Sequence, residues 1–397
     1  MNAFIFTRNA LIIQRNKKIY FVEKSMDHQM DTYVANLLDE GVEKGVFPGA
    51  AVALSWGSGS ARRRSFSVAG SKDSRYPDDP ISLNTFFDLA SLSKPLATTL
   101  LVYSLINKDS ISLETTLSEI FPREIPLDKR IITVAQLLSH SSGLTGYKSF
   151  FKKFVPVIRE ENKERLLRYI LDEPLEYEPG SRCLYSDLGF MLLGFLVEEV
   201  TGISLVTNFR EHISIPAGLE KQIFYNPVIG SRRDEKDFAA TEDCPWRGRI
   251  MRAEVHDEHC WLMDGVSGHA GLFGTAGGVL SLCESILESL QGREKKFSWS
   301  TMVARGLQKQ YPDQTWCLGF DSPSQQKSSG GKYLSPGSIG HLGYAGTSFW
   351  IDPEKELVVV LLTNRVNPSR ENTKIRQFRP YFHDSVIQKL QVETAGK

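Results

Sequence analysis

The chain has 397 residues, in which 47 Lys and Arg balance 47 Asp and Glu, so the formal net charge is zero. This balance gives no overall field that would draw the protein to nucleic acid or to an anionic membrane, and any partner must be recognised at a local site. The length is sufficient to bury a large core, in one two-lobed unit or in two to three domains.

Two features bear on where the protein works. The apolar run within residues 1–25 is too short to span a bilayer, is interrupted by Arg8, Arg15 and Lys17, and has no small-residue cleavage site. We therefore predict neither a signal peptide nor an anchor, and expect a poorly ordered N-terminal extension. The five cysteines include no C-x-x-C pair, and their odd number argues against a complete disulfide framework. Reduced thiols favour a cytoplasmic location.

Helix and strand patterns alternate in the first part of the chain. Apolar residues recur three and four apart between residues 26 and 44, which predicts an amphipathic helix. Residues 50–70 predict a β-hairpin around a Gly- and Ser-containing turn. Residues 94–107 have helical apolar spacing, and Pro95 suits a first helical turn. Ser91 should then lie at the mouth of this helix.

The middle of the chain, from about 97 to 250, is mostly helical in period. One helix should begin at Thr133 as its N-cap, and another should cover residues 186–200 and end at Gly202. Strand patterns return near the C-terminus, where residues 347–364 predict a second hairpin.

These patterns predict a single unit over residues 26–390. Its α/β body should consist of residues 26–96 and 265–390, with an inserted, mostly helical lobe over residues 97–264. Residues 322–333 are rich in Ser, Gly and Lys and predict a surface loop.

Ser91 and Lys94 form the first pattern that indicates chemistry. A serine hydroxyl is a weak nucleophile until a neighbouring group takes its proton, and positions three apart share one face of a helix. Other S-x-x-K matches occur at 149–152, 324–327 and 329–332. Only the Ser91 copy lies where a hairpin and a short loop lead into an apolar helix. We expect burial there to lower the pKa of Lys94.

The segment FFDLASLSKPLATTLL around Ser91 resembles the first motif of the class C β-lactamase and penicillin-binding-protein-like serine hydrolase superfamily. VAQLLSHSSGL at 134–144 and EPGSRCLYSDLGFMLLGFLVEEVTG at 178–202 are similar to segments that follow in the same order. The resemblance implies an α/β (α+β) fold with an antiparallel sheet flanked by helices. It also implies a serine hydrolase that forms an acyl-enzyme on Ser91 and needs no metal or organic cofactor.

Residues 185–187 (YSD) stand at the second motif of the family and residues 340–343 (GHLG) at the third, and both depart from the family pattern. Tyr185 is retained, and the resemblance implies a general base or proton shuttle once nearby cations favour phenolate. Asp187 stands where the family has Asn, and His341 stands where it has Lys. A histidine is mostly neutral at pH 7, and an added carboxylate repels anions and keeps Lys94 charged. We therefore expect an esterase or amidase rather than an efficient β-lactamase.

The third motif is also expected to contribute through its backbone. The resemblance implies an oxyanion hole formed by the backbone N–H groups of Ser91 and Tyr344, and such donors commonly contribute about 3 kcal/mol each. Gly343 should let the substrate backbone approach closely.

Residues 241–259 and 364–380 look like a subgroup associated with cell-wall muropeptide recycling, which includes muramoyl-alanine amidases. This adds a muramoyl-peptide amidase or D-amino-acid peptidase as an alternative, with a small molecule or a muropeptide as substrate. His256, Asp257 and Arg247 could then contact the substrate. A non-catalytic muropeptide sensor is an alternative of another class.

A metal-dependent hydrolase is the third hypothesis, built on His256, His259 and His269. The histidines lack the helical H-E-x-x-H frame, which makes the pattern a loose one. VSGHAGLFGTAGG at 266–278 instead resembles the glycine-rich stretch by which the superfamily returns to its α/β body.

Overall fold

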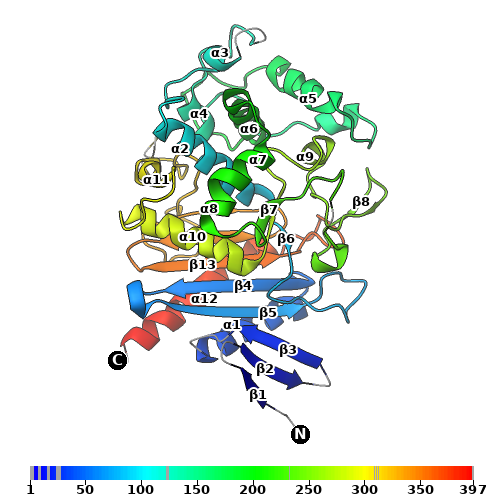
Figure 1. The fold of residues 1–397 in the computed structure, drawn as a ribbon, viewed down its shortest axis with the longest axis vertical. Coiled ribbons are helices and arrows are strands. Elements are labelled where there is room, and N and C mark those ends of the chain that lie inside the picture. Colours follow the sequence, from blue (N-terminus) through cyan, green and yellow to red (C-terminus); the bar gives the residue numbers. More distant parts are fainter. Residues whose placement is uncertain are drawn as a thin grey trace.

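The computed structural model describes residues 28–121, 125–231, 233–307, 309, 311 and 313–395, together with the backbone of residues 4–7, 10–15 and 18–23. Helices cover both faces of a five-stranded antiparallel sheet, and a mostly helical lobe extends from one of these faces (Figure 1). The predicted α/β body with an inserted helical lobe is therefore the observed architecture.

The main sheet joins the two predicted hairpins. In order across the sheet its strands are β11 (Ile339–Leu342), β12 (Ser348–Asp352), β13 (Leu357–Thr363), β4 (Gly49–Trp56) and β5 (Arg63–Gly70). β4 and β5 form the first hairpin and β12 and β13 the second. β13 pairs with β4, from Leu357 opposite Trp56 to Thr363 opposite Ala50. This pairing joins strands from the early and the late part of the chain into one sheet.

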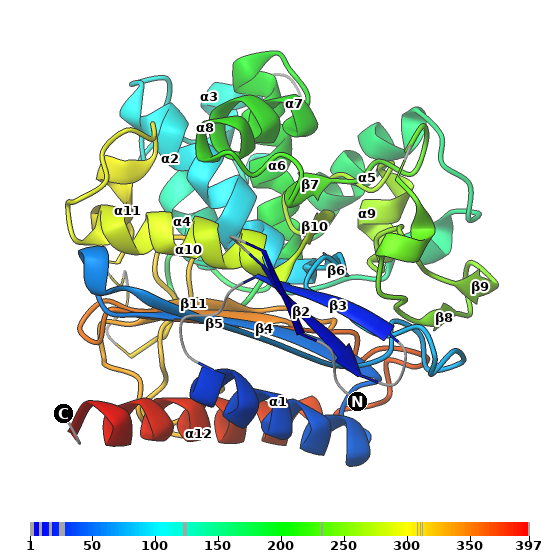
Figure 2. The same ribbon diagram turned by 60° about the horizontal axis from the view of Figure 1, so that its bottom comes forward.

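Helices bury the central strands on both faces. On one face, Val52 of β4 and Val359 of β13 pack with α1 (His28–Glu43) and α12 (Ile375–Ala395). On the other, Ala53 and Val360 belong to the core that includes α10 (Ala276–Leu290). Figure 2 shows α1 and α12 below the sheet and α10 above it. α1 confirms the predicted N-terminal helix, whereas no sequence pattern predicted α12.

The helical lobe confirms the predicted helix boundaries. Thr133 begins α4 (Val134–Leu138) in a capping box, and Gly202 ends α6 (Asp187–Thr201) at a φ of 70°. The remaining helices here are α2 (Leu100–Asn107), α3 (Leu117–Ile120), α5 (Glu161–Asp172), α7 (Leu205–Phe209), α8 (Ile215–Ala217) and α9 (Glu258–Leu262). α11 (Ser300–Gly306) belongs to the later part of the chain and contacts α10 and α2. Among the described residues, no single helix is long and apolar enough to cross a membrane. Only α6 taken together with α7–α8 has that length and composition, and this pair is bent by 83°.

Short strands that the sequence did not predict connect the lobe to the body. β6 (Phe87–Asp88), β10 (Leu272–Gly274) and β7 (Ile223–Tyr225) form a three-stranded antiparallel sheet, and β8 (Asp243–Cys244) pairs with β9 (Arg249–Ile250). Strands of two or three residues are too short to show alternation, so local sequence does not reveal them. β6 leads directly to Ser91.

The N-terminal extension differs from the expected poorly ordered segment. Its described parts form three strands, β1 (Phe4–Thr7), β2 (Ala10–Arg15) and β3 (Lys18–Glu23), which pair antiparallel in that order. β2 is the central strand and is hydrogen-bonded to both β1 and β3. Residues 1–3, 8–9, 16–17 and 24–27 lie outside the described residues.

Candidate active site

A strained turn presents Ser91 at the end of β6. Ser91 lies in a 3-10 turn (Ala90–Leu92), and a π-helical segment (Lys94–Thr99) then leads into α2. Ala90 has a φ of 49°, which is unfavourable for a residue with a Cβ. Asp88 Oδ1 accepts a hydrogen bond from the Ala90 N–H at 2.8 Å and so holds this conformation. The predicted helix exists, but its first turns are wider than an α-helix.

The Lys94 ammonium lies below Ser91 and has three acceptors. Its Nζ is 3.0 Å from Ser91 Oγ, 2.6 Å from Asp187 Oδ1 and 3.1 Å from the His269 carbonyl. Burial alone would lower the pKa of Lys94, but the negative charge of Asp187 outweighs burial, with a smaller contribution from Tyr185, and the pKa is raised. The expected lowering of this pKa by burial is therefore wrong, whereas the expectation that Asp187 keeps Lys94 charged is confirmed.

His140 holds the second motif over Lys94. Its carbonyl accepts from the Leu184 N–H at 2.8 Å, and its Nδ1 accepts from the Ser186 N–H at 3.1 Å. The Asp187 N–H donates to the Gly146 carbonyl at 2.9 Å, at the start of α6. The loop that follows α4 thereby fixes the positions of Tyr185 and Asp187. His140 belongs to the family-like segment 134–144, but the sequence did not indicate its role, because its contacts are made through the fold.

Tyr185 is a neutral phenol in this site. Its ring stacks on Trp316 with centroids 5.2 Å apart, and Lys94 Nζ lies 5.0 Å from the ring centroid. Burial raises the pKa of Tyr185, and the charge of Lys94 does not offset it because Asp187 acts in the opposite direction. The expectation that nearby cations favour phenolate is therefore wrong for the resting site.

His341 of β11 faces the same aromatic group. Its centroid lies 5.9 Å from that of Tyr185 and 5.7 Å from that of Trp316. Its Nδ1 lies 2.8 Å from the Leu342 carbonyl, which can only accept, so this nitrogen carries the proton. Burial, with the charge of Lys94, lowers the pKa of His341 to about 3. His341 is therefore neutral, as the sequence predicted.

Gly343 is needed for packing within the protein, whereas the sequence predicted that it makes room for the substrate backbone. A Cβ at this position would lie 1.9 Å from Thr347 Oγ1 and 2.8 Å from the Leu89 carbonyl. Thr347 Oγ1 donates to this carbonyl at 3.1 Å and ties the loop after β11 to the segment that carries Ser91. The close packing of the two segments thus requires glycine here, independently of any substrate.

The expected oxyanion donors have no hydrogen-bond partner in the part of the chain that the structure describes. No acceptor is found for the backbone N–H of Ser91 or of Tyr344 among the described residues. Both residues line one cavity of about 660 Å³. The Tyr344 side chain is 49% exposed at this cavity. The two N–H groups therefore remain available to an oxygen atom bound in the cavity.

The cavity unites the residues predicted from separate motifs. Six of them line it, namely Ser91, Tyr185, Asp187, His341, Gly343 and Tyr344, and Lys94 lies beneath Ser91. His256 and Asp257 also line it, whereas Arg247 does not and donates to the Val255 and His256 carbonyls. Sequence reasoning missed Trp316 and four arginines in the wall, Arg365, Arg370, Arg376 and Arg379. The only signal for the arginines was their density in residues 364–380.

The three histidines of the metal hypothesis have separate partners. His256 Nε2 lies 3.0 Å from Glu242 Oε2, and His269 Nε2 lies 2.9 Å from Asp257 Oδ1. His259 Nε2 accepts from the Phe151 N–H at 3.2 Å. These nitrogens are each used in a different hydrogen bond, so they do not form a common ligand set.

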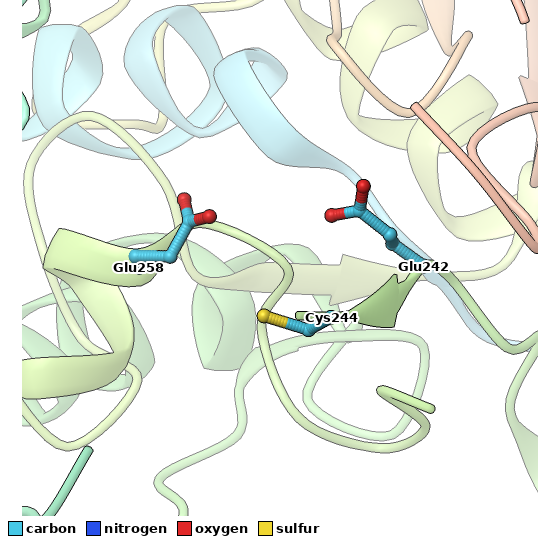
Figure 3. Close-up of side chains that lie close together, drawn as sticks. All are labelled: Glu242, Cys244 and Glu258. Atoms are coloured by element: carbon cyan, nitrogen blue, oxygen red, sulfur yellow. The ribbon is translucent and has the colours of Figure 1, made fainter. Parts of the chain in front are cut away.

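Glu242, Cys244 and Glu258 do have the spacing of metal ligands, with ligand atoms within 4.8 Å of one another (Figure 3). Arg370 supplies the positive charge at this group, because its guanidinium lies 2.5 Å from Glu242 Oε2 and 2.6 Å from Glu258 Oε1. Burial alone would raise the pKa of Glu242, but His256 and Arg370 lower it to about 2. The group is best explained as an arginine clamp in the cavity wall.

Ser91 and Lys94 lie within hydrogen-bond distance at one cavity, and the backbone N–H groups of Ser91 and Tyr344 have no acceptor among the described residues. This arrangement suits a serine hydrolase. The chain belongs to the Beta-lactamase family, whose model matches residues 34–379. The expected superfamily, the fold and the serine hydrolase class are thereby confirmed.

Named relatives agree with this assignment. A protein of Escherichia coli named "Putative D-alanyl-D-alanine carboxypeptidase" is 29% identical over 362 residues, which cover 85% of this chain and 82% of the relative. A protein of the same name from Salmonella heidelberg is 32% identical over 314 residues, covering 74% and 72%. The solved structure of "EstCE1, a hydrolase with promiscuous acyltransferase activity" shares the fold at a TM-score of 0.69 and 21% identity, covering 88% and 98%.

Proposed function

We propose that the protein is a serine peptidase that removes a D-amino acid from the carboxyl end of a short peptide. Arg376 carries this proposal. Arg365 and Arg379 donate to backbone carbonyls, and Arg370 binds two carboxylates. Arg376 lines the same cavity, is exposed, and has no side-chain acceptor among the described residues. A guanidinium suits a carboxylate in bidentate geometry, so Arg376 offers a contact for the end of a peptide.

Two further observations support a peptide substrate with a free carboxylate. The neutral His341 cannot replace the family lysine as a cation, so another residue must hold a carboxylate. The E. coli and Salmonella relatives are both named for a carboxypeptidase reaction on D-alanine peptides. The recycled muropeptides expected from residues 241–259 and 364–380 belong to the same substrate class.

The acylation step begins with a proton relay. In the resting site Lys94 is an ammonium, so it must release a proton before it can accept one. Asp187 Oδ1 lies 2.6 Å away and takes this proton, while Lys94 takes the proton of Ser91 Oγ as that oxygen attacks the scissile carbonyl. The backbone N–H groups of Ser91 and Tyr344 then hold the oxyanion.

Collapse of the tetrahedral intermediate completes acylation. Tyr185 donates its phenol proton to the leaving amine as the carbon–nitrogen bond breaks. Lys94 returns a proton to the phenolate and regains one from Asp187, so the proton of Ser91 ends on the product. Water enters in place of the amine, and the same groups in reverse order release the acid and restore Ser91.

A paired-substrate assay tests the proposal. Short peptides that end in D-alanine should be cleaved faster as free acids than as C-terminal amides, and faster than peptides that end in L-alanine. Arg376→Met should reduce kcat/KM for the free acid by about 10- to 100-fold through KM, and less for the amide. Lys374→Met is the matched control, because Lys374 is also exposed, lies two residues away and donates to the Lys44 carbonyl. Equal cleavage of acid and amide would contradict the proposal.

A carboxylesterase is the second candidate. Tyr147 and Tyr344 at the cavity are 43% and 49% exposed, and Trp316 lies in its wall, which suits an apolar acyl group. This candidate predicts rapid turnover of aryl esters with no cleavage of either peptide.

We also propose a cytoplasmic location, which is supported by the five free cysteines, four of them buried.

A further inference from the structure

Arg379 of α12 is a buried cation whose partners are backbone atoms. The residue is only 7% exposed, and none of the described carboxylates forms an ion pair with it. Its Nη2 donates to the Gly343 carbonyl at 2.8 Å and to the Thr347 carbonyl at 3.0 Å. Burying a charge without a counter-ion is costly. The backbone carbonyls in the loop after β11 offset this cost by accepting hydrogen bonds from the guanidinium.

The bond to Gly343 determines the direction of the neighbouring N–H. The Gly343 carbonyl and the Tyr344 N–H belong to one planar trans peptide, so they point in opposite directions. Because Arg379 holds the carbonyl on the α12 side, the Tyr344 N–H is directed away from α12. This N–H is one of the two expected oxyanion donors and has no acceptor among the described residues.

Arg365 holds the next peptide of the same loop. Its Nε and Nη2 donate to the Tyr344 carbonyl at 2.9 and 2.6 Å. The N–H of that peptide belongs to Ala345, which is not an expected oxyanion donor. The two arginines therefore make similar contacts on adjacent peptides, and only the contact of Arg379 acts on the peptide that carries the oxyanion donor.

We propose that Arg379 is a positioning residue that orients and polarises the Gly343–Tyr344 peptide, so that the Tyr344 N–H is aligned for the oxyanion before the substrate binds. A charged donor on the carbonyl strengthens the N–H of the same peptide as a donor. A donor that is already aligned needs no reorganisation during reaction, and this alignment is the main source of oxyanion stabilisation. The inference rests on the acyl-enzyme at Ser91 but not on the choice of peptide substrate.

Kinetics of Arg379 variants with an activated aryl ester test the proposal. Arg379→Met should lower kcat by about 100-fold with KM changed by less than about threefold, the size expected for one lost oxyanion donor. Arg365→Met is the matched control and should lower kcat by less than about tenfold. The carbonyl stretch of the acyl-enzyme, measured by infrared difference spectroscopy, should move to higher frequency in Arg379→Met and stay near the wild-type value in Arg365→Met.

Equal losses of kcat in the two Met variants, with the carbonyl stretch unchanged, would mean that the arginines only order the loop, and would overturn the proposal. If Arg379→Met does not fold, Arg379→Lys carries the test, because lysine keeps the charge but loses the fork geometry. It should lower kcat by about tenfold and raise the stretch, and wild-type values of both would overturn the proposal. Ester kinetics are independent of peptide preference, so a failure of the peptidase proposal would leave these results interpretable.

Discussion

Two serines of this molecule have the hydrogen-bonded partners that hydrolases use. Ser91 Oγ lies 3.0 Å from Lys94 Nζ, which lies 2.6 Å from Asp187. Ser267 Oγ lies 2.8 Å from His269 Nδ1, whose Nε2 lies 2.9 Å from Asp257. By residue type and distance, the Ser267 set has the partners of a Ser-His-Asp triad.

Access to substrate separates the two sets. Ser267 is 5% exposed and does not line the active-site cavity, whereas Ser91 lines it together with the free N–H of Tyr344. A nucleophile needs space for the reacting carbonyl and donors for the oxyanion as well as a base. Hydrogen-bond geometry alone would therefore have assigned the reaction to both serines, although only one of them can reach a substrate.

The two sets are also connected. The His269 carbonyl is the third acceptor of Lys94, at 3.1 Å, while the His269 ring is held by Ser267 and Asp257. The Ser267 set thus positions the His269 residue, whose backbone carbonyl accepts a hydrogen bond from Lys94. The comparison predicts catalytic effects for substitutions in the first set and effects on stability for those in the second.

The largest contrast is expected between the two serine variants. Ser91→Ala should lower kcat for an activated ester by at least about 1000-fold and abolish the mass adduct formed with a fluorophosphonate. Ser267→Ala should keep kcat within about threefold, because no substrate carbonyl reaches it. A fluorophosphonate adduct on Ser267, or none on Ser91 in folded protein, would reverse the comparison.

Asp187→Asn should change the pH dependence of acylation. In the wild type, the carboxylate accepts the Lys94 proton, so kcat/KM should be level through neutral pH. The variant loses this acceptor together with the charge that raises the pKa of Lys94. Lys94 must then be neutral before acylation, and kcat/KM should fall about tenfold for each pH unit below its new, lower pKa. The test is a profile of kcat/KM from about pH 5 to 10. A wild-type enzyme that already shows this slope would contradict the relay.

Asp257→Asn should affect stability more than catalysis. Burial alone would raise the pKa of Asp257, but His269 holds it well below its usual range. Such a carboxylate stabilises the fold fully above its unfolded pKa of about 3.9, and the contribution is lost as pH falls through the folded value. The free energy of unfolding should therefore fall by about 1.5 to 3 kcal/mol at pH 7, and by less at about pH 3.

Urea unfolding at the two pH values measures this effect. Asp234→Asn is the control, because Asp234 is exposed and caps a 3-10 turn without a histidine partner, so its variant should show a smaller difference. Asp257 Oδ1 accepts from the Cys260 N–H and also lies beside His269 Nε2, so asparagine can keep both contacts. The main change in Asp257→Asn is then the loss of negative charge beside His269. A loss of stability equal at both pH values would show that this ion pair is not responsible.

Local sequence determined the elements whose signals are local. Apolar spacing defined α1 and α6, capping residues fixed the start of α4, and strand alternation with turn residues defined both hairpins. The motifs and their order also identified Ser91, Lys94, Tyr185 and His341, because the chemistry restricts the residue types at each position.

Only the tertiary structure decided which of two opposing effects sets the pKa of Lys94, and which groups support the site residues. The pKa of Lys94 depends on a carboxylate 93 residues away in the chain, and its direction reversed the expectation from burial. Arg379 and His140 act on backbone atoms through contacts that leave no pattern in the sequence. Hydrogen bonds and charge interactions depend on distances between segments, and only the folded chain sets those distances.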